Sequence, residues 1–169
     1  MDIIFEGIKQ AFLLLVHRDS QIWQITCLSL VVSGAATLLS LCIGIPLGSF
    51  IGLSRFPCRR LLISLINTGM GSPPVVVGLI ISISLWRNGP LGFLHILYTP
   101  TAMIIAQIII SLPIITSFTL TAIQQLDPKL RLQILALGAS RVQMVWLLLK
   151  ETRLSLLAAI MAGFGAVIS

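Results

Sequence analysis

Long stretches without a charged residue constrain this chain more than any other feature of its sequence. No Asp, Glu, Lys or Arg occurs between Asp19 and Arg55, and three further uncharged stretches follow. One such charge at the centre of a bilayer costs on the order of 3 kcal/mol on an insertion scale. Only 9% of the 169 residues are charged, against ~25% in soluble domains. We therefore expect an all-α integral membrane protein, a helical bundle with about four spans.

The uncharged stretches predict spans at about residues 21–53, 61–86, 99–123 and 154–169, with a loop at 124–153. As a helix, the first span would be ~50 Å long against ~30 Å of hydrocarbon. It must therefore tilt, kink near Pro46 or project from the membrane. Residues 1–20 precede this transmembrane domain, and their apolar residues recur at helical spacing. They predict an amphipathic helix lying in the interface, although a frayed polar leader explains them about as well.

Basic residues set the expected orientation, because loops rich in Lys and Arg stay in the cytoplasm. One face carries Arg55, Arg59, Arg60, Lys129, Arg131, Arg141, Lys150 and Arg153. The other carries only Lys9, Arg18 and Arg87. We therefore expect a multi-pass protein of a plasma membrane with its N-terminus outside. The net charge of +6 then reflects orientation in the lipid bilayer, and no nucleic-acid partner is expected.

The absence of ionisable residues from the first three spans argues against two functional classes. Proton-coupled carriers and membrane-embedded enzymes need such residues inside the bilayer. The cysteines, Cys27, Cys42 and Cys58, have no C-x-x-C spacing. The sequence therefore predicts no catalytic residues, no metal site and no cofactor.

Glycine and proline interrupt the second span near its middle, at Gly69, Gly71, Pro73 and Pro74. Such a break persists only where protein or a water-filled cavity satisfies the freed backbone groups. A structural kink and a pathway-lining role are equally good interpretations. The third span adds neutral polar side chains that suit the rapid passage of an anion. The pathway-lining candidates are Ser72, Pro73, Pro74, Gln107, Ser111 and Thr116.

Small residues recur at four-residue intervals in the first and fourth spans. The two series are Gly44, Gly48, Gly52 and Ser155, Ala159, Gly163. This spacing lets helix backbones approach closely, so we expect these residues to serve helix packing rather than ligand binding.

The loop at 124–153 predicts two short capped helices. Asp127 before Pro128 is typical of a helix start, and Gly138 of a helix end. Ser140 and Gln143 then have the spacing of a capping box. An ordinary structured loop and a docking element for a cytoplasmic partner both fit this pattern. Because no phosphate-binding G-x-x-x-x-G-K-[ST] motif is present, ATP hydrolysis would belong to another chain.

The loop sequence LRLQILALGASR, from Leu130 to Arg141, resembles the EAA loop of bacterial ABC importer permeases. There are two departures, with Leu132 at the loop's acidic position and Ile134 at its first alanine. Other segments closely resemble tungstate-type ABC permeases, and together they cover nearly the whole chain. They are IGIPLG from Ile43, RFPCRRLLISLINTGMGSPPVVVGL from Arg55, GPLGFL from Gly89, TPTAMIIAQIIISLPI from Thr99 and LLAAIMAGFG from Leu156.

The resemblance implies a type I ABC importer fold in a bacterial or archaeal inner membrane. It implies an ATPase subunit, an extracytoplasmic oxyanion-binding protein and a second permease copy as partners. The implied coupling residues are Leu130, Arg131, Gln133, Ala136, Gly138, Ala139 and Ser140. Tungstate is the expected cargo, with molybdate or sulfate as alternatives. A secondary carrier and a non-transporting membrane scaffold are the alternatives from other classes.

Relatives in this family continue beyond the equivalent of Ile168 and Ser169. The last span would also be only ~24 Å long as a helix. From these two observations we expect that the chain is cut short and that these 169 residues do not transport by themselves.

Overall fold

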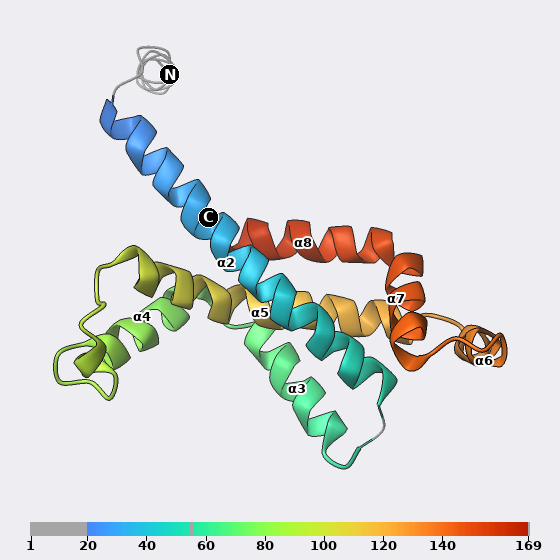
Figure 1. Ribbon diagram of the computed structural model, residues 1–169. Coiled ribbons are helices and arrows are strands. Elements are labelled where there is room, and N and C mark those ends of the chain that lie inside the picture. The colour runs from blue at the N-terminus through green and yellow to red at the C-terminus, as the bar shows by residue number, and fades with distance from the viewer. Residues whose placement is uncertain (1–19, 55, 169) are drawn as a thin grey trace, which may run out of the picture.

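The computed structural model describes residues 20–54 and 56–168, so the predicted interfacial helix at the N-terminus lies outside the described residues. The described part is all-helical, as expected (Figure 1). Its elements are α2 Ser20–Leu53, α3 Arg59–Met70, α4 Pro74–Leu85, η1 Gly92–Leu94, α5 Pro100–Gln124, α6 Pro128–Ala136, α7 Arg141–Glu151 and α8 Arg153–Ile168.

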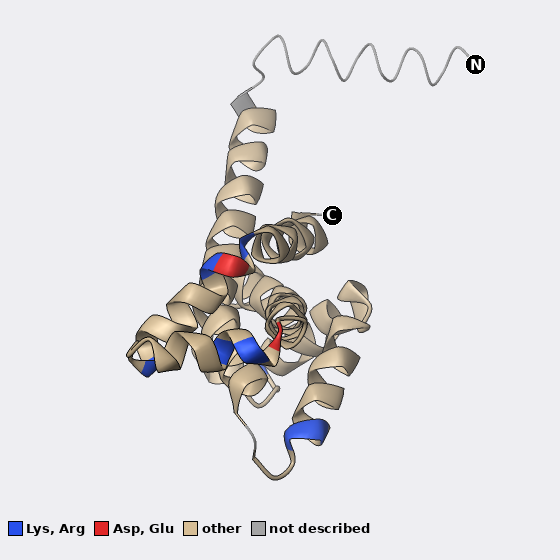
Figure 2. Cartoon of the chain, turned by 90° about the vertical axis from the view of Figure 1, so that its right-hand side faces the viewer, with Lys and Arg blue, Asp and Glu red and all other residues tan. Residues whose placement is uncertain are grey.

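Helices α2 and α5 cross at the centre of the molecule and form its main packing seam (Figure 1). Helix α8 packs against both of them, and α3 and α4 pack on α5. Both α2 and α5 are long and apolar enough to cross a membrane. Figure 2 shows charged residues at helix ends and in connections, while the bodies of the long helices carry none.

Two helix pairs are bent, one within the predicted span at 61–86 and one where the predicted loop at 124–153 meets the last predicted span. Helices α3 and α4 meet at 99°, and α7 and α8 meet at 73°. If each pair is one broken span, the described residues contain up to four candidate spans, and otherwise two. The first bend lies at the predicted glycine and proline break, because Gly71 caps α3 and Pro74 begins α4.

The glycines of α2 confirm the packing interpretation. A Cβ atom on Gly48 would lie 2.7 Å from the Thr116 carbonyl oxygen of α5, and one on Gly44 2.9 Å from the Ile115 side chain. On α8, Ala159 and Gly163 are buried. Small residues therefore bring the backbones of the central helices together.

Candidate functional site

Helices α6 and α7 form the capped pair that the loop sequence predicts. The Asp127 side chain accepts a hydrogen bond from the Lys129 amide at 2.9 Å, and Pro128 takes the first helical position. After α6, Gly138 has a φ of +84°, a conformation that costs a residue with a Cβ atom about 1 kcal/mol or more. Ser140 then forms the expected capping box with Gln143. These predictions are confirmed.

The predicted coupling residues gather on this pair at one end of the molecule. Leu130 and Ala139 are half-buried, whereas Arg131, Gln133, Ala136, Gly138 and Ser140 are exposed. Several large apolar side chains beside them also have a high exposed fraction. Leu132 is 67% exposed, Leu137 87% and Val142 80%. The pair thus presents exposed apolar side chains at one end of the molecule (Figure 1).

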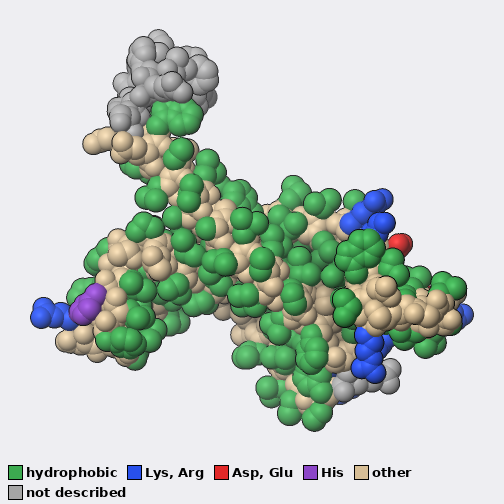
Figure 3. All heavy atoms as spheres, viewed as in Figure 1, with side chains coloured by type: hydrophobic (Ala, Val, Ile, Leu, Met, Phe, Trp, Pro, Cys, Tyr) green, Lys and Arg blue, Asp and Glu red, His purple; other side chains and the backbone are tan. Residues whose placement is uncertain are grey.

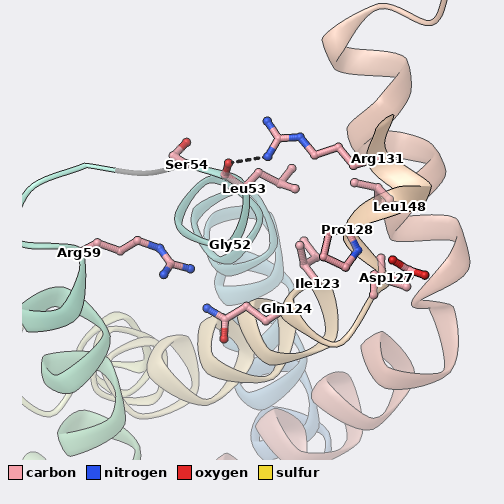
Figure 4. Close-up of a pocket in the computed structure, with 11 residues that line it drawn as sticks. Gly52, Leu53, Ser54, Arg59, Ile123, Gln124, Asp127, Pro128, Arg131 and Leu148 are labelled. Atoms are coloured by element: carbon pink, nitrogen blue, oxygen red, sulfur yellow. Dashed lines mark hydrogen bonds between the residues drawn. The ribbon is translucent and has the colours of Figure 1, made fainter. Parts of the chain in front are cut away.

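Two arginines bind the C-terminal end of α2, a contact that the sequence analysis missed. Arg131 of α6 donates to the Leu53 carbonyl oxygen at 2.9 Å, and Arg59 of α3 donates to that of Ile51 at 2.8 Å. Figure 4 shows them on different sides of the helix end, beside a cavity of about 360 Å³. Cations at a helix C-terminus compensate its partial negative charge. No local motif marks such pairings, because the partners are far apart in sequence.

This contact also places two basic regions at the same end of the molecule. Arg59 and Arg60 begin α3 directly after the connection from α2, whereas Lys129 and Arg131 lie in α6 and Arg141 begins α7. The hydrogen bond from Arg131 to Leu53 joins the two regions. In Figure 3, apolar side chains cover the central helices, and basic ones appear around α6 and α7 and towards the end of α2.

The six pathway candidates fall into two groups. Ser72, Pro73 and Pro74 lie at the bend between α3 and α4, where Ser72 is half-buried and both prolines are exposed. Ser72 donates its hydroxyl proton to the Thr68 carbonyl oxygen at 3.2 Å. A bend of this kind leaves backbone groups free for another partner.

The other three candidates lie in the packing of α5. Ser111 is fully buried and its hydroxyl oxygen lies 2.6 Å from that of Ser40 on α2. Thr116 is also buried and donates to the Leu112 carbonyl oxygen. Gln107 donates to Ser33 at 3.3 Å and to the Val167 carbonyl oxygen at 3.1 Å, which joins α2, α5 and α8. Its own Oε1 is buried without a hydrogen-bond partner.

Comparison with known protein families shows the family to which this chain belongs. The family described as binding-protein-dependent transport system inner membrane component matches residues 44–169. The chain belongs to this family. It is therefore a permease subunit of a binding-protein-dependent ABC transporter in the inner membrane.

Individual relatives are consistent with this assignment. The chain is 38% identical to the tungstate uptake system permease protein TupB of Peptoclostridium acidaminophilum over all of its residues and 74% of that protein. It is 40% identical to a probable anion ABC transporter permease protein of Haloferax volcanii, over 86% of the chain and 62% of the relative. The molybdenum transport system permease protein ModB of Escherichia coli K12 is 31% identical over 70% of the chain and 55% of its own length.

Proposed function

We propose that this permease serves an ATP-driven importer of tungstate and forms its translocation pathway. The observation that carries the proposal is the similarity to a tungstate uptake permease along the whole chain. The molybdenum permease is less similar and covers less of the chain. The absence of charged side chains from α2 and α5 fits an anion that must pass without being trapped.

The pair α6 and α7 is the proposed docking element for a separate ATPase subunit. Exposed apolar side chains in a connection between spanning helices favour contact with another protein. Leu132 and Leu137 supply that surface on α6 and just after it, and Gly138 sets the angle between the helices. The other coupling residues predicted from the sequence lie on the same pair of helices and would belong to the same docking element.

The bend at residues 72–74 is the proposed pathway element. It carries a hydroxyl and no charge, and the Ser72 hydroxyl would have to leave the Thr68 carbonyl oxygen to donate to a passing oxyanion. Gln107, Ser111 and Thr116 would support the wall of the pathway by holding α5 against α2 and α8. A second permease copy would complete the pathway, and an oxyanion-binding protein would deliver the cargo on the face opposite α6.

Cysteine labelling tests the proposed orientation, with the N-terminus outside. On a cysteine-free background, Arg60→Cys should react with an impermeant reagent only after permeabilisation. Phe93→Cys, at an exposed position of the connection after α4, should react in intact cells. The reverse pattern would contradict the proposed topology, and reaction of both from one side would mean that α3 and α4 form a re-entrant loop.

Co-purification with the ATPase subunit of an oxyanion ABC importer tests the docking proposal. Gly138→Val forces a branched side chain into a positive-φ position and should lower ATPase recovery and stimulation at least several-fold. Gly165→Val adds the same side chain to a glycine of α8 with open space around it, outside the docking element, and is the matched control. Equal behaviour of the two variants and the parent would exclude Gly138 as the hinge of a docking element.

Uptake in cells without other oxyanion importers tests the cargo. The chain is supplied with its ATPase and binding protein, both by itself and completed with the unmatched part of the Peptoclostridium relative. The completed form should take up tungstate in preference to molybdate and sulfate. Preference for another anion would overturn the cargo assignment, and uptake by the 169 residues alone would contradict the expectation that they do not transport.

A further inference from the structure

A second groove lies beside the helix end that the two arginines bind. It has a volume of about 620 Å³ and runs between the last turns of α2 and helices α6 and α7. This is within the roughly 300–1,000 Å³ of ordinary ligand sites. Its walls are mostly apolar and include Pro46, Phe50, Met144 and Leu149. An apolar ligand portion would fit along these walls.

Arg131 and Arg141 also line this groove, and the described residues around it include no carboxylate. A guanidinium group has five N–H donors, and Arg131 uses one of its terminal nitrogens for the Leu53 carbonyl oxygen. Arg141 is exposed and has no hydrogen bond or ion pair within the described part of the chain. Arg131 already compensates part of the negative end of α2, whereas Arg141 has no such partner, and the two arginines next to apolar walls favour an anionic amphiphile.

The position of the groove matches the edge of a membrane. The candidate span Gln21–Leu53 ends at the groove, and basic residues follow it immediately. Phe50, which lines the groove, is 62% exposed, and Ile43 and Leu47 on the same part of α2 are exposed as well. The groove therefore opens onto the apolar outer surface of α2 at the level where headgroups lie.

We propose that this groove binds one anionic phospholipid. The headgroup phosphate lies between Arg131 and Arg141, and an acyl chain follows Phe50 and Leu149 along α2. Basic pockets between spanning helices recognise lipid headgroups in this way. A free oxyanion would use the arginines but not the apolar walls, and an apolar protein segment would leave both charges without an anionic partner. This site does not depend on the identity of the cargo.

Native mass spectrometry of the purified chain, titrated with phosphatidylglycerol or phosphatidylcholine, tests the proposal. One phosphatidylglycerol should be retained with about 25-fold preference over phosphatidylcholine, since each of the two arginines contributes about fivefold. Arg141→Gln should lower its affinity about fivefold. Lys129→Gln and Lys150→Gln remove the same charge outside the groove and are the matched controls, expected to stay within about twofold.

Arg131→Gln also breaks the hydrogen bond to Leu53, so Arg131→Lys is measured beside it to preserve the charge. Retention of lipid by the lysine variant and loss by the glutamine variant support the site. Equal losses in the groove variants and the controls would mean nonspecific surface attraction and overturn the proposal. Displacement of the lipid by millimolar inorganic phosphate would also overturn it, because the site would then be one for free anions.

Discussion

Helix α4 is as strongly apolar as α2 and α5, which form the central seam, yet the bent pair α3 and α4 is held in a different way from the seam. Seven residues of α5 are buried at or near the seam, including Ser111, Ile115 and Thr119. Helix α3 has no buried residue and α4 has one, Leu85. Equal hydrophobicity therefore does not produce equal packing in a membrane protein, because lipid solvates apolar side chains as well as protein does.

Small residues and buried hydroxyl groups account for the difference. In α2, glycines admit the backbone of α5 to within van der Waals contact. In α4, Gly78 would have nothing within 4 Å of an added Cβ atom. The seam is therefore packed more closely than the contacts of α3 and α4 with α5.

The largest expected effect comes from placing the same methyl group in both regions. Gly48→Ala should lower the free energy of unfolding by about 2–3 kcal/mol, because the new atom would lie 2.7 Å from a backbone oxygen that cannot move alone. Gly78→Ala should leave it unchanged or raise it by up to about 1 kcal/mol. Unfolding by denaturing detergent in mixed micelles measures both, and equal effects would refute the comparison.

Local sequence patterns predicted the capped helices, the break and the small-residue faces. Asp127, Gly138 and Ser140 act on backbone groups within a few residues, so their spacing is sufficient. The pairing of Ser40 with Ser111, and of Arg131 with the end of α2, joins distant segments. Those partners depend on how the helices pack. The bend angles also depend on this packing, so a local sequence pattern does not predict them.

A hydroxyl pair gives the second-largest expected effect. Because the Ser111 hydroxyl donates to the Gln107 carbonyl oxygen, Ser40 donates to Ser111 at 2.6 Å. Ser111→Ala should cost about 1 kcal/mol in the same unfolding assay, since Ser40 stays buried with a poorer partner. Ser82→Ala on exposed α4 is the control and should change little. A cost at Ser82 as large as that at Ser111 would contradict this account.

The contact of α3 with α5 should tolerate a methyl group better than the seam does. On Gly69, a Cβ atom would lie 3.1 Å from the Pro113 ring, a side-chain neighbour that can shift slightly. Gly69→Ala should therefore cost no more than about 1 kcal/mol. An added Cβ atom on Gly165 would have no neighbour within 4 Å, so Gly165→Ala gives the change in unfolding free energy for a methyl group without contacts. A cost equal to that of Gly48→Ala would show that α3 is held as tightly as α2.

The smallest effect is expected at the polar contact between α3 and α5. Ser117 donates to the Asn67 side-chain oxygen at 3.0 Å in an exposed position. Asn67→Ala should cost about 0.6 kcal/mol or less, the average for such bonds in membranes. The double variant Asn67→Ala, Ser117→Ala should cost nearly the same as the single one. Additive losses would mean that each side chain has another role.

The two arginines at the end of α2 reach it at different times during synthesis. Arg59 follows α2 directly and is available as soon as α3 begins. Arg131 is made about 70 residues later, which takes on the order of 4–14 s at ~5–20 residues per second. Throughout that interval the Leu53 carbonyl lacks its partner from α6. The second bond forms only after α5 has been made, so it completes the connection between the two basic regions as a late step of biogenesis.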